Sequence, residues 1–103
     1  MSADAATESS APQGPKIDDT GTVAQYANFC RVTGTPEELI IDFGLNTQAR
    51  PGDDAPVKVT ARTVMNYYTA KRLLQALGMS VARHEQAFGP LETNVQKRLS
   101  AKA

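Results

Sequence analysis

Three stretches of the chain have the period of two that predicts β-strands, although in the first of them both faces are partly apolar. The stretches run from Gln25 to Thr33, from Glu38 to Leu45 and from about Val57 to Met65. The second stretch predicts a core face on one side of the sheet, made of Leu39, Ile41, Phe43 and Leu45. One face of the third strand is polar, so we expect it to contact water.

The segments between these strands predict a hairpin and a long loop. Gly34-Thr35-Pro36-Glu37 combines a residue that tolerates positive φ with one that fixes φ near −65°, as a tight turn between antiparallel strands requires. Residues 46–56 contain turn formers and charges without periodic apolar residues. They predict an exposed loop.

A helical period replaces the strand period after Met65 and predicts a helix from about Tyr67 to Phe88. Asn66 can cap its first turn, and Gly89 followed by Pro90 is a strong stop signal. The apolar stripe that we expect to dock on the sheet consists of Ala70, Leu73, Leu74, Leu77, Val81, His84 and Phe88. Gly78 interrupts this helix, which suggests close packing or a kink.

The pattern therefore predicts an α+β domain of order β-β-β-α, in which one long amphipathic helix packs on a three-stranded antiparallel sheet. We assign this domain to residues 24–91. Residues 1–23 hold too few large apolar groups to offset the entropy of ordering, and we expect a disordered tail. Residues 92–103 are basic and predict a weakly helical tail.

Composition narrows the function classes. Eleven Lys and Arg balance eleven Asp and Glu, so the chain has no global attraction for nucleic acid or an anionic membrane. A single cysteine suits a reducing compartment, and we expect a cytoplasmic location. The first residues do not resemble a secretory signal, and no stretch approaches the roughly 18 apolar residues of a membrane span.

The small size of the domain predicts self-association, because a domain of this size without disulfides or metals is only marginally stable alone. We expect a homodimer, with an interface on the sheet face that the helix leaves uncovered. Its predicted apolar residues are Phe29, Ile40 and Val64. The alternative is that these are ordinary exposed apolar groups, which every folded surface carries.

Two other binding functions remain open. In one, a dimer binds nucleic acid phosphates with basic residues of the outer sheet face and the helix start, namely Arg31, Lys58, Arg62, Lys71 and Arg72. In the other, a chaperone-like adaptor offers apolar sheet surface, such as Phe29 or Ile40, to unfolded proteins. The protein partner itself is not specified by the sequence.

No set of residues predicts an active site, so we expect a non-enzymatic protein without a metal or cofactor. Cys30 and His84 are each the single residue of their kind, and nothing in the sequence brings them together. His84-Glu85 begins a zinc-protease signature, but Phe88 stands where its second histidine is needed. Three further partial matches are each too incomplete to predict a site. Asp53 and Asp54 resemble part of a calcium loop, and Gly34, Gly44 and Gly52 do not form a phosphate-binding loop. Asp42-Phe43-Gly44 matches a kinase tripeptide by letters alone.

Four segments in order resemble one uncharacterised bacterial family, the domain of unknown function 3467. They are Tyr26-Ala27-Asn28, the Thr-Pro-Glu-Glu turn, Asp42-Phe43-Gly44 and the Ala-Lys-Arg-Leu-Leu segment of the predicted helix. The resemblance spans roughly Tyr26 to Leu91. The chain departs from the family pattern at Cys30, at Asn66-Tyr67-Tyr68 and at His84, and the resemblance implies no activity, cofactor or substrate.

Overall fold

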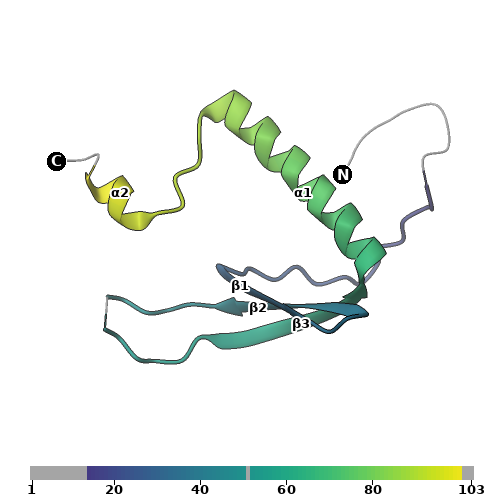
Figure 1. Cartoon of the computed structure of the whole chain (residues 1–103), viewed down its shortest axis with the longest axis horizontal. Helices are drawn as coiled ribbons and strands as arrows, with labels where there is room; N and C mark the ends of the chain where they lie inside the picture. The colour runs from purple at the N-terminus through teal and green to yellow at the C-terminus, as the bar shows by residue number, and fades with distance from the viewer. Residues whose placement is uncertain (1–13, 51, 101–103) are drawn as a thin grey trace.

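The computed structural model describes residues 14–50 and 52–100. They form strands β1 (Phe29–Gly34), β2 (Glu38–Leu45) and β3 (Lys58–Asn66), the long helix α1 (Tyr67–Phe88) and the short helix α2 (Val95–Ser100). Strand β2 pairs antiparallel with both neighbours, which gives the strand order β1-β2-β3 (Figure 1). The predicted α+β fold class is confirmed. Most of the predicted tail, residues 1–23, lies outside the described residues.

The turn between β1 and β2 is built by Thr35. Its backbone N–H donates to the carbonyl of Glu38 at 2.9 Å, and its hydroxyl oxygen accepts from the N–H groups of Glu37 and Glu38. The pairing runs from Gly34 opposite Leu39 to Phe29 opposite Gly44. The hairpin is therefore confirmed, and β2 has its predicted bounds.

Strand β1 begins four residues later than predicted, at Phe29 instead of Gln25. The physical reason is that β2 offers no partner farther along. The N–H of Asn28 donates to the carbonyl of Gly44 at 3.2 Å, and the Asn28 side chain then exchanges two hydrogen bonds with the backbone of Asn46 at 2.7 and 3.0 Å. An extended segment without a neighbouring strand cannot continue the sheet.

The two faces of the sheet differ in what covers them. We call the face beneath α1 the inner face; Val32, Leu39 and Ile41 lie on it and line a groove together with α1 side chains. On the outer face, alternation along the strands places the side chains of Arg31, Asp42 and Arg62. Nothing in the described part of the chain lies over this outer face (Figure 1).

A β-bulge shifts the pairing of β2 with β3. Phe43 lies opposite Ala61 and Gly44 opposite Val59, so Thr60 is an extra residue on β3. A Cβ atom on Gly44 would stand 2.5 Å from the carbonyl oxygen of Lys58. Only glycine therefore allows this close approach of the two backbones.

Helix α1 starts and stops where the sequence predicts. The side chain of Asn66 accepts from the N–H of Thr69 at 2.8 Å, and Gly89, at φ 94°, donates its N–H to the carbonyl of Glu85 at 2.8 Å. Strand β3 ends at Asn66 and α1 begins at Tyr67, so no loop separates them. The Tyr67 hydroxyl also donates to the carbonyl of Thr35 at 3.1 Å, which ties the helix start to the hairpin turn.

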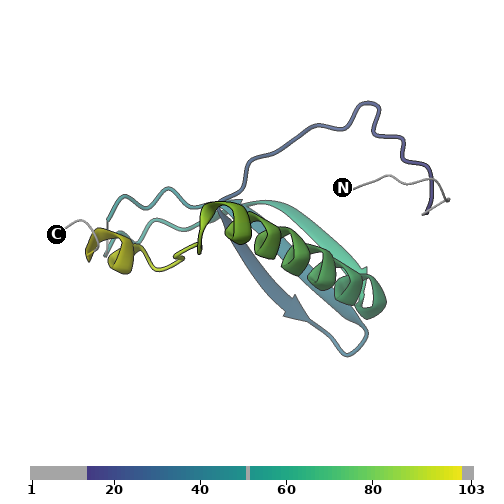
Figure 2. The same ribbon diagram turned by 90° about the horizontal axis from the view of Figure 1, so that it is seen from above.

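From this fixed start α1 lies over the inner face and rises away from the sheet along its length (Figures 1 and 2). Its residues as far as Leu77 line the groove, whereas Phe88 is 79% exposed. The predicted docking of the apolar stripe is thus correct for its first half and wrong for its second half. Apart from the adjoining helix backbone, a Cβ on Gly78 would meet no atom within 4 Å, so close packing against other elements of the chain does not explain this glycine.

Candidate functional site

The centre of the outer face is an ion cluster of Arg31, Asp42 and Arg62, one residue from each strand. Arg31 donates to Asp42 Oδ2 from Nη2 at 2.6 Å and from Nε at 3.2 Å. Arg62 donates from Nε to Asp42 Oδ1 at 2.6 Å and from Nη2 to Oδ2 at 3.2 Å. The Asp42 side chain is 1% exposed beneath the two guanidinium groups, whose side chains are 54% and 59% exposed.

These hydrogen bonds keep Asp42 ionised. Donation from Arg62, followed by donation from Arg31, lowers the pKa of the carboxyl from 3.8 to about 2, against the opposing effect of desolvation. The hydrogen bond with Asp42 in turn raises the pKa of the Arg62 guanidinium. Asp42 thus fixes two cations on the middle of the sheet, and the three charges together leave the cluster with one net positive charge.

The predicted dimer residues surround this cluster on the outer face. Ile40 lies opposite Val64 on β3 and opposite Thr33 on β1, in the row beside the cluster. Phe29 lies opposite Gly44, in the row on its other side. Val64 is 53% exposed, and Ile40 and Phe29 are half-buried. The structure brings the three residues to one face but separates them by the charged row, so their apolar surface is not continuous.

The five basic residues predicted for nucleic acid do not gather on one surface. Arg31 and Arg62 share Asp42 on the outer face, whereas Lys71 lines the groove on the inner face. Lys58 begins β3 beyond the bulge, and Arg72 is exposed on α1. Only one pair of the five is held together, and a carboxylate lies between its members.

The inner face carries the larger apolar surface. Its groove has a volume of about 580 Å³ between the sheet and the first half of α1. The lining is apolar except for Lys71 and the hydroxyl of Tyr67, and it comprises Val32, Leu39, Ile41, Tyr67, Ala70, Lys71, Leu73, Leu74 and Leu77. Among the described residues Ile41 is the single buried apolar side chain, at 8% exposure, and Leu74 is 70% exposed.

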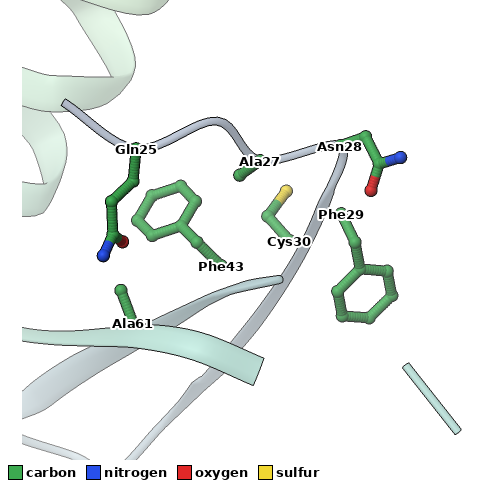
Figure 3. A pocket seen from close by; sticks show the side chains of 7 residues that line it. All are labelled: Gln25, Ala27, Asn28, Phe29, Cys30, Phe43 and Ala61. Carbon is green, nitrogen blue, oxygen red and sulfur yellow. The ribbon is translucent and has the colours of Figure 1, made fainter. Parts of the chain in front are cut away.

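A second hollow, of about 530 Å³, lies toward the other end of the inner face. Cys30, Phe43 and Ala61 form its floor, and Gln25 and Ala27 border it from the segment before β1 (Figure 3). Asn28 and Phe29 complete the lining, although the ring of Phe29 points away from that of Phe43 (Figure 3). No α1 residue and no charged side chain lines this hollow.

The residues with possible chemistry are distributed over different elements. Cys30 is an exposed free thiol in the hollow, and the ring of His84 lies 4.8 Å from that of Phe88 on the second half of α1. Asp53 binds the N–H groups of Ala49 and Ala55 within its own loop. Within residues 14–50 and 52–100, no three His, Cys, Asp or Glu side chains are close enough to share a metal ion.

The family model for proteins of unknown function DUF3467 matches residues 1–93. The chain belongs to this family. The resemblance seen in the sequence motifs is therefore confirmed, and the DUF3467 match also covers the segment before Tyr26. No curated protein and no solved structure is significantly similar to the chain. No helix in the described part of the chain is long and apolar enough to cross a membrane.

The DUF3467 motifs of this chain coincide with the devices that hold the sheet. Asn28 clamps the start of β1 to Asn46, and Thr35 closes the hairpin. In Asp42-Phe43-Gly44, the first residue holds the ion cluster, the second lies in the hollow and the third permits the bulge. The motifs thus specify the sheet and its two faces.

Sequence reasoning did not identify Asp42 as the centre of a cluster. A signal was present, because an acid within the apolar run of β2 has to find a partner. The predicted turn also sets the hairpin register, which places Arg31 opposite Asp42. Once β3 is paired with β2, Arg62 lies opposite Asp42 on the other side.

Proposed function

We propose that this DUF3467 chain is a non-enzymatic, homodimeric interaction module that pairs through the inner face of its sheet and the apolar stripe of α1. The observation that carries this proposal is the incomplete core. Ile41 is the one buried apolar side chain in the described part of the chain, while Leu74, Leu77, Val81 and Phe88 on α1 are exposed. A second copy would cover these groups.

The choice of the inner face rests on the continuity of its apolar surface. The groove and the hollow lie on the same side of the sheet, and the stripe of α1 faces that side with its first half. Standard dimers bury roughly 1,200–2,000 Å² in total, with an apolar centre. The outer face, where the sequence predicts the dimer interface, has Arg31, Asp42 and Arg62 across its middle.

Pairing through the inner face would leave the outer face free for another protein. Each copy would then present two half-exposed guanidinium groups with Ile40 and Val64 beside them. This arrangement supports a role in assembly more directly than in nucleic acid binding, because Asp42 neutralises one of the two cations. It also leaves an adaptor role for the outer face, which a client-binding assay on the dimer would test.

The non-enzymatic part of the proposal is supported by the dispersal of reactive side chains. We expect Cys30→Ser to retain the dimer and its thermal stability, since the thiol would serve only as a small apolar group. Cytoplasm is the compartment that we propose, because an exposed thiol such as Cys30 survives best in a reducing environment. Cell fractionation would check this location.

The test is the oligomeric state of the full chain, measured by light scattering after size-exclusion chromatography over a range of micromolar concentrations. We expect twice the mass of one chain, independent of salt, because apolar contacts dominate the interface. The melting temperature should rise with concentration, as it does when folding and association are coupled. A cooperatively folded monomer over the whole range would refute the proposal.

A matched pair of α1 variants then tests the location. Leu77→Glu places a charge in the groove stripe and should abolish the dimer, whereas Gln75→Glu adds the same charge at an exposed polar position and should leave it intact. If Leu77→Glu remained dimeric, the inner face would not be the interface.

A further inference from the structure

The apolar stripe of α1 continues beyond the groove. After Leu77 the side chains of Val81, His84 and Phe88 follow at intervals of four, three and four residues, so they extend one face of the helix. None of the three lines the groove or the hollow of its own chain. His84 and Phe88 instead contact each other in a tilted arrangement, with ring centroids 4.8 Å apart and planes at 41°.

The hollow is an apolar surface of the sheet that no helix side chain of its own chain lines. It has apolar side chains on its floor and no charged group, and no α1 residue lines it, because α1 rises away from the sheet toward this end (Figure 1). Phe43 remains 36% exposed there. The small side chains of Cys30 and Ala61 beside it leave room for a large group.

Helix α1 is poorly placed to fill the hollow of its own chain. The Asn66 cap and the hydrogen bond from Tyr67 to Thr35 fix its first turn, and a continuous helix of 22 residues keeps that direction over about 33 Å. The helix has no proline to bend it toward the sheet. The helix α1 of a second copy can approach the hollow from another direction, because its start is fixed to a different sheet.

We infer that the hollow of each chain receives the second half of the partner's helix α1, with Phe88 and His84 seated against Phe43, Cys30 and Ala61. The inference rests on the proposed dimer and specifies its geometry. Aromatic rings pair favourably with other rings and with sulfur, and both kinds of group line the hollow. One helix end inserts into each hollow, so the interface is self-complementary and closes with two-fold symmetry.

In this arrangement each helix serves two sheets. Its first half covers the groove of its own chain and its second half covers the hollow of the partner. The sheet would then be covered along its whole inner face, although the described part of each chain supplies one long helix. The hollow is thus a recognition site for an aromatic helix end.

The experiment uses Cys30, the single cysteine of the chain, as a fixed probe in the hollow. One chain keeps the natural sequence, and a second chain with a distinguishing tag carries Cys30→Ser and Phe88→Cys. The chains are mixed, allowed to exchange, and treated with mild oxidant or with a short bismaleimide, which tolerates a wider sulfur spacing. We expect a covalent pair of one natural and one tagged chain on a denaturing gel.

A control chain carries Cys30→Ser and Gln86→Cys, which places the thiol on the same helix but off the stripe, and it should give at least tenfold less of the mixed pair. Val81→Cys in the Cys30→Ser background is a second probe on the stripe, which keeps the test valid if loss of the Phe88 ring weakens the dimer. Efficient mixed cross-linking from position 88 or 81 supports the inference.

Four results would overturn it. A chain carrying both Cys30 and Phe88→Cys could form an internal disulfide, which would show that α1 covers its own hollow. Two Phe88→Cys residues could cross-link to each other alone, which would pair helix with helix. No cross-link in a chain that scatters light as a dimer would refute this geometry and leave the proposed function intact, whereas a folded monomer would refute both.

Discussion

The two faces of the sheet follow opposite rules. On the outer face, every charge of the central cluster finds its partner within one chain, since Arg31 and Arg62 both bind Asp42. On the inner face, much of the apolar surface stays exposed, because α1 covers only the groove. Strand register is thus encoded within one chain, whereas the inner face leaves apolar surface that the proposed dimer would cover.

The largest effect should come from the one buried apolar side chain of the inner face. Ile41→Ala removes the residue that both strand neighbours and the groove enclose, at a cost of about 2–5 kcal/mol of unfolding free energy. Ile40→Ala is the matched control, because it deletes the same atoms from the half-buried outer face and should cost clearly less. Urea unfolding measures the loss of unfolding free energy in both variants. Equal losses would show that the inner and outer faces do not differ in how much they stabilise the chain.

The next effect concerns the bulge that both faces share. Gly44→Ala brings a methyl group to within 2.5 Å of the Lys58 carbonyl, and the resulting backbone shift should cost about 1–3 kcal/mol. Gly78→Ala adds the same methyl group where, apart from the adjoining helix backbone, no atom lies within 4 Å, so it should not lower stability and should favour the helix by up to about 1 kcal/mol. Thermal unfolding followed by circular dichroism measures both, and a stable Gly44→Ala variant would contradict the tight pairing.

Acid should weaken the outer face specifically. Since the pKa of Asp42 falls from 3.8 to about 2 on folding, its contribution is fully present above pH 3.8 and is lost as the pH falls through about 2. Because both arginines are half exposed, solvent screens the ion pairs and the loss of stability should be small. Denaturant midpoints measured from about pH 5 to about pH 1, a range that brackets both pKa values, would show this decline.

Asp42→Asn tests the origin of that decline. The variant should be less stable at neutral pH, because two cations face each other without an anion, and its stability should depend less on pH over the same range. Asp54→Asn, in the exposed loop, should behave like the unmodified chain. An unchanged acid response in Asp42→Asn would show that another carboxyl is responsible.

The smallest effect should come from the outer apolar row. Val64 is already 53% exposed, so Val64→Glu should change stability by no more than about 0.5 kcal/mol and should leave the dimer intact. Light scattering checks the mass. A monomeric Val64→Glu variant would move the interface to the outer face, as the sequence first suggested for Phe29, Ile40 and Val64.

Local signals predicted the elements well. The Gly-Thr-Pro-Glu turn, the Asn66 cap and the Gly89-Pro90 stop gave β2 and α1 their correct bounds, because each signal depends on a few neighbouring residues. The start of β1 was wrong, since a strand ends where its partner ends and the alternation of Gln25 to Asn28 does not contain that information. The role of Asp42 also depended on pairing with two other strands.

The path of α1 could not be predicted from its own pattern. Periodicity shows which side of a helix is apolar, and the first half of the stripe does line the groove. Periodicity does not show how steeply the helix leaves the sheet, because that angle is set by the Asn66 junction and by the contact of Tyr67 with the hairpin turn. The hollow at Cys30 and Phe43 is a consequence of this angle.

The direct joint between β3 and α1 also limits how this chain can change in length. One residue inserted between Asn66 and Tyr67 would turn every later helical position by about 100° about the helix axis, since a turn holds 3.6 residues. Leu74 and Leu77 would then leave the groove, although no side chain had been altered. The loop of residues 46–56 has no such helical phase, so we expect an insertion there to leave the groove intact.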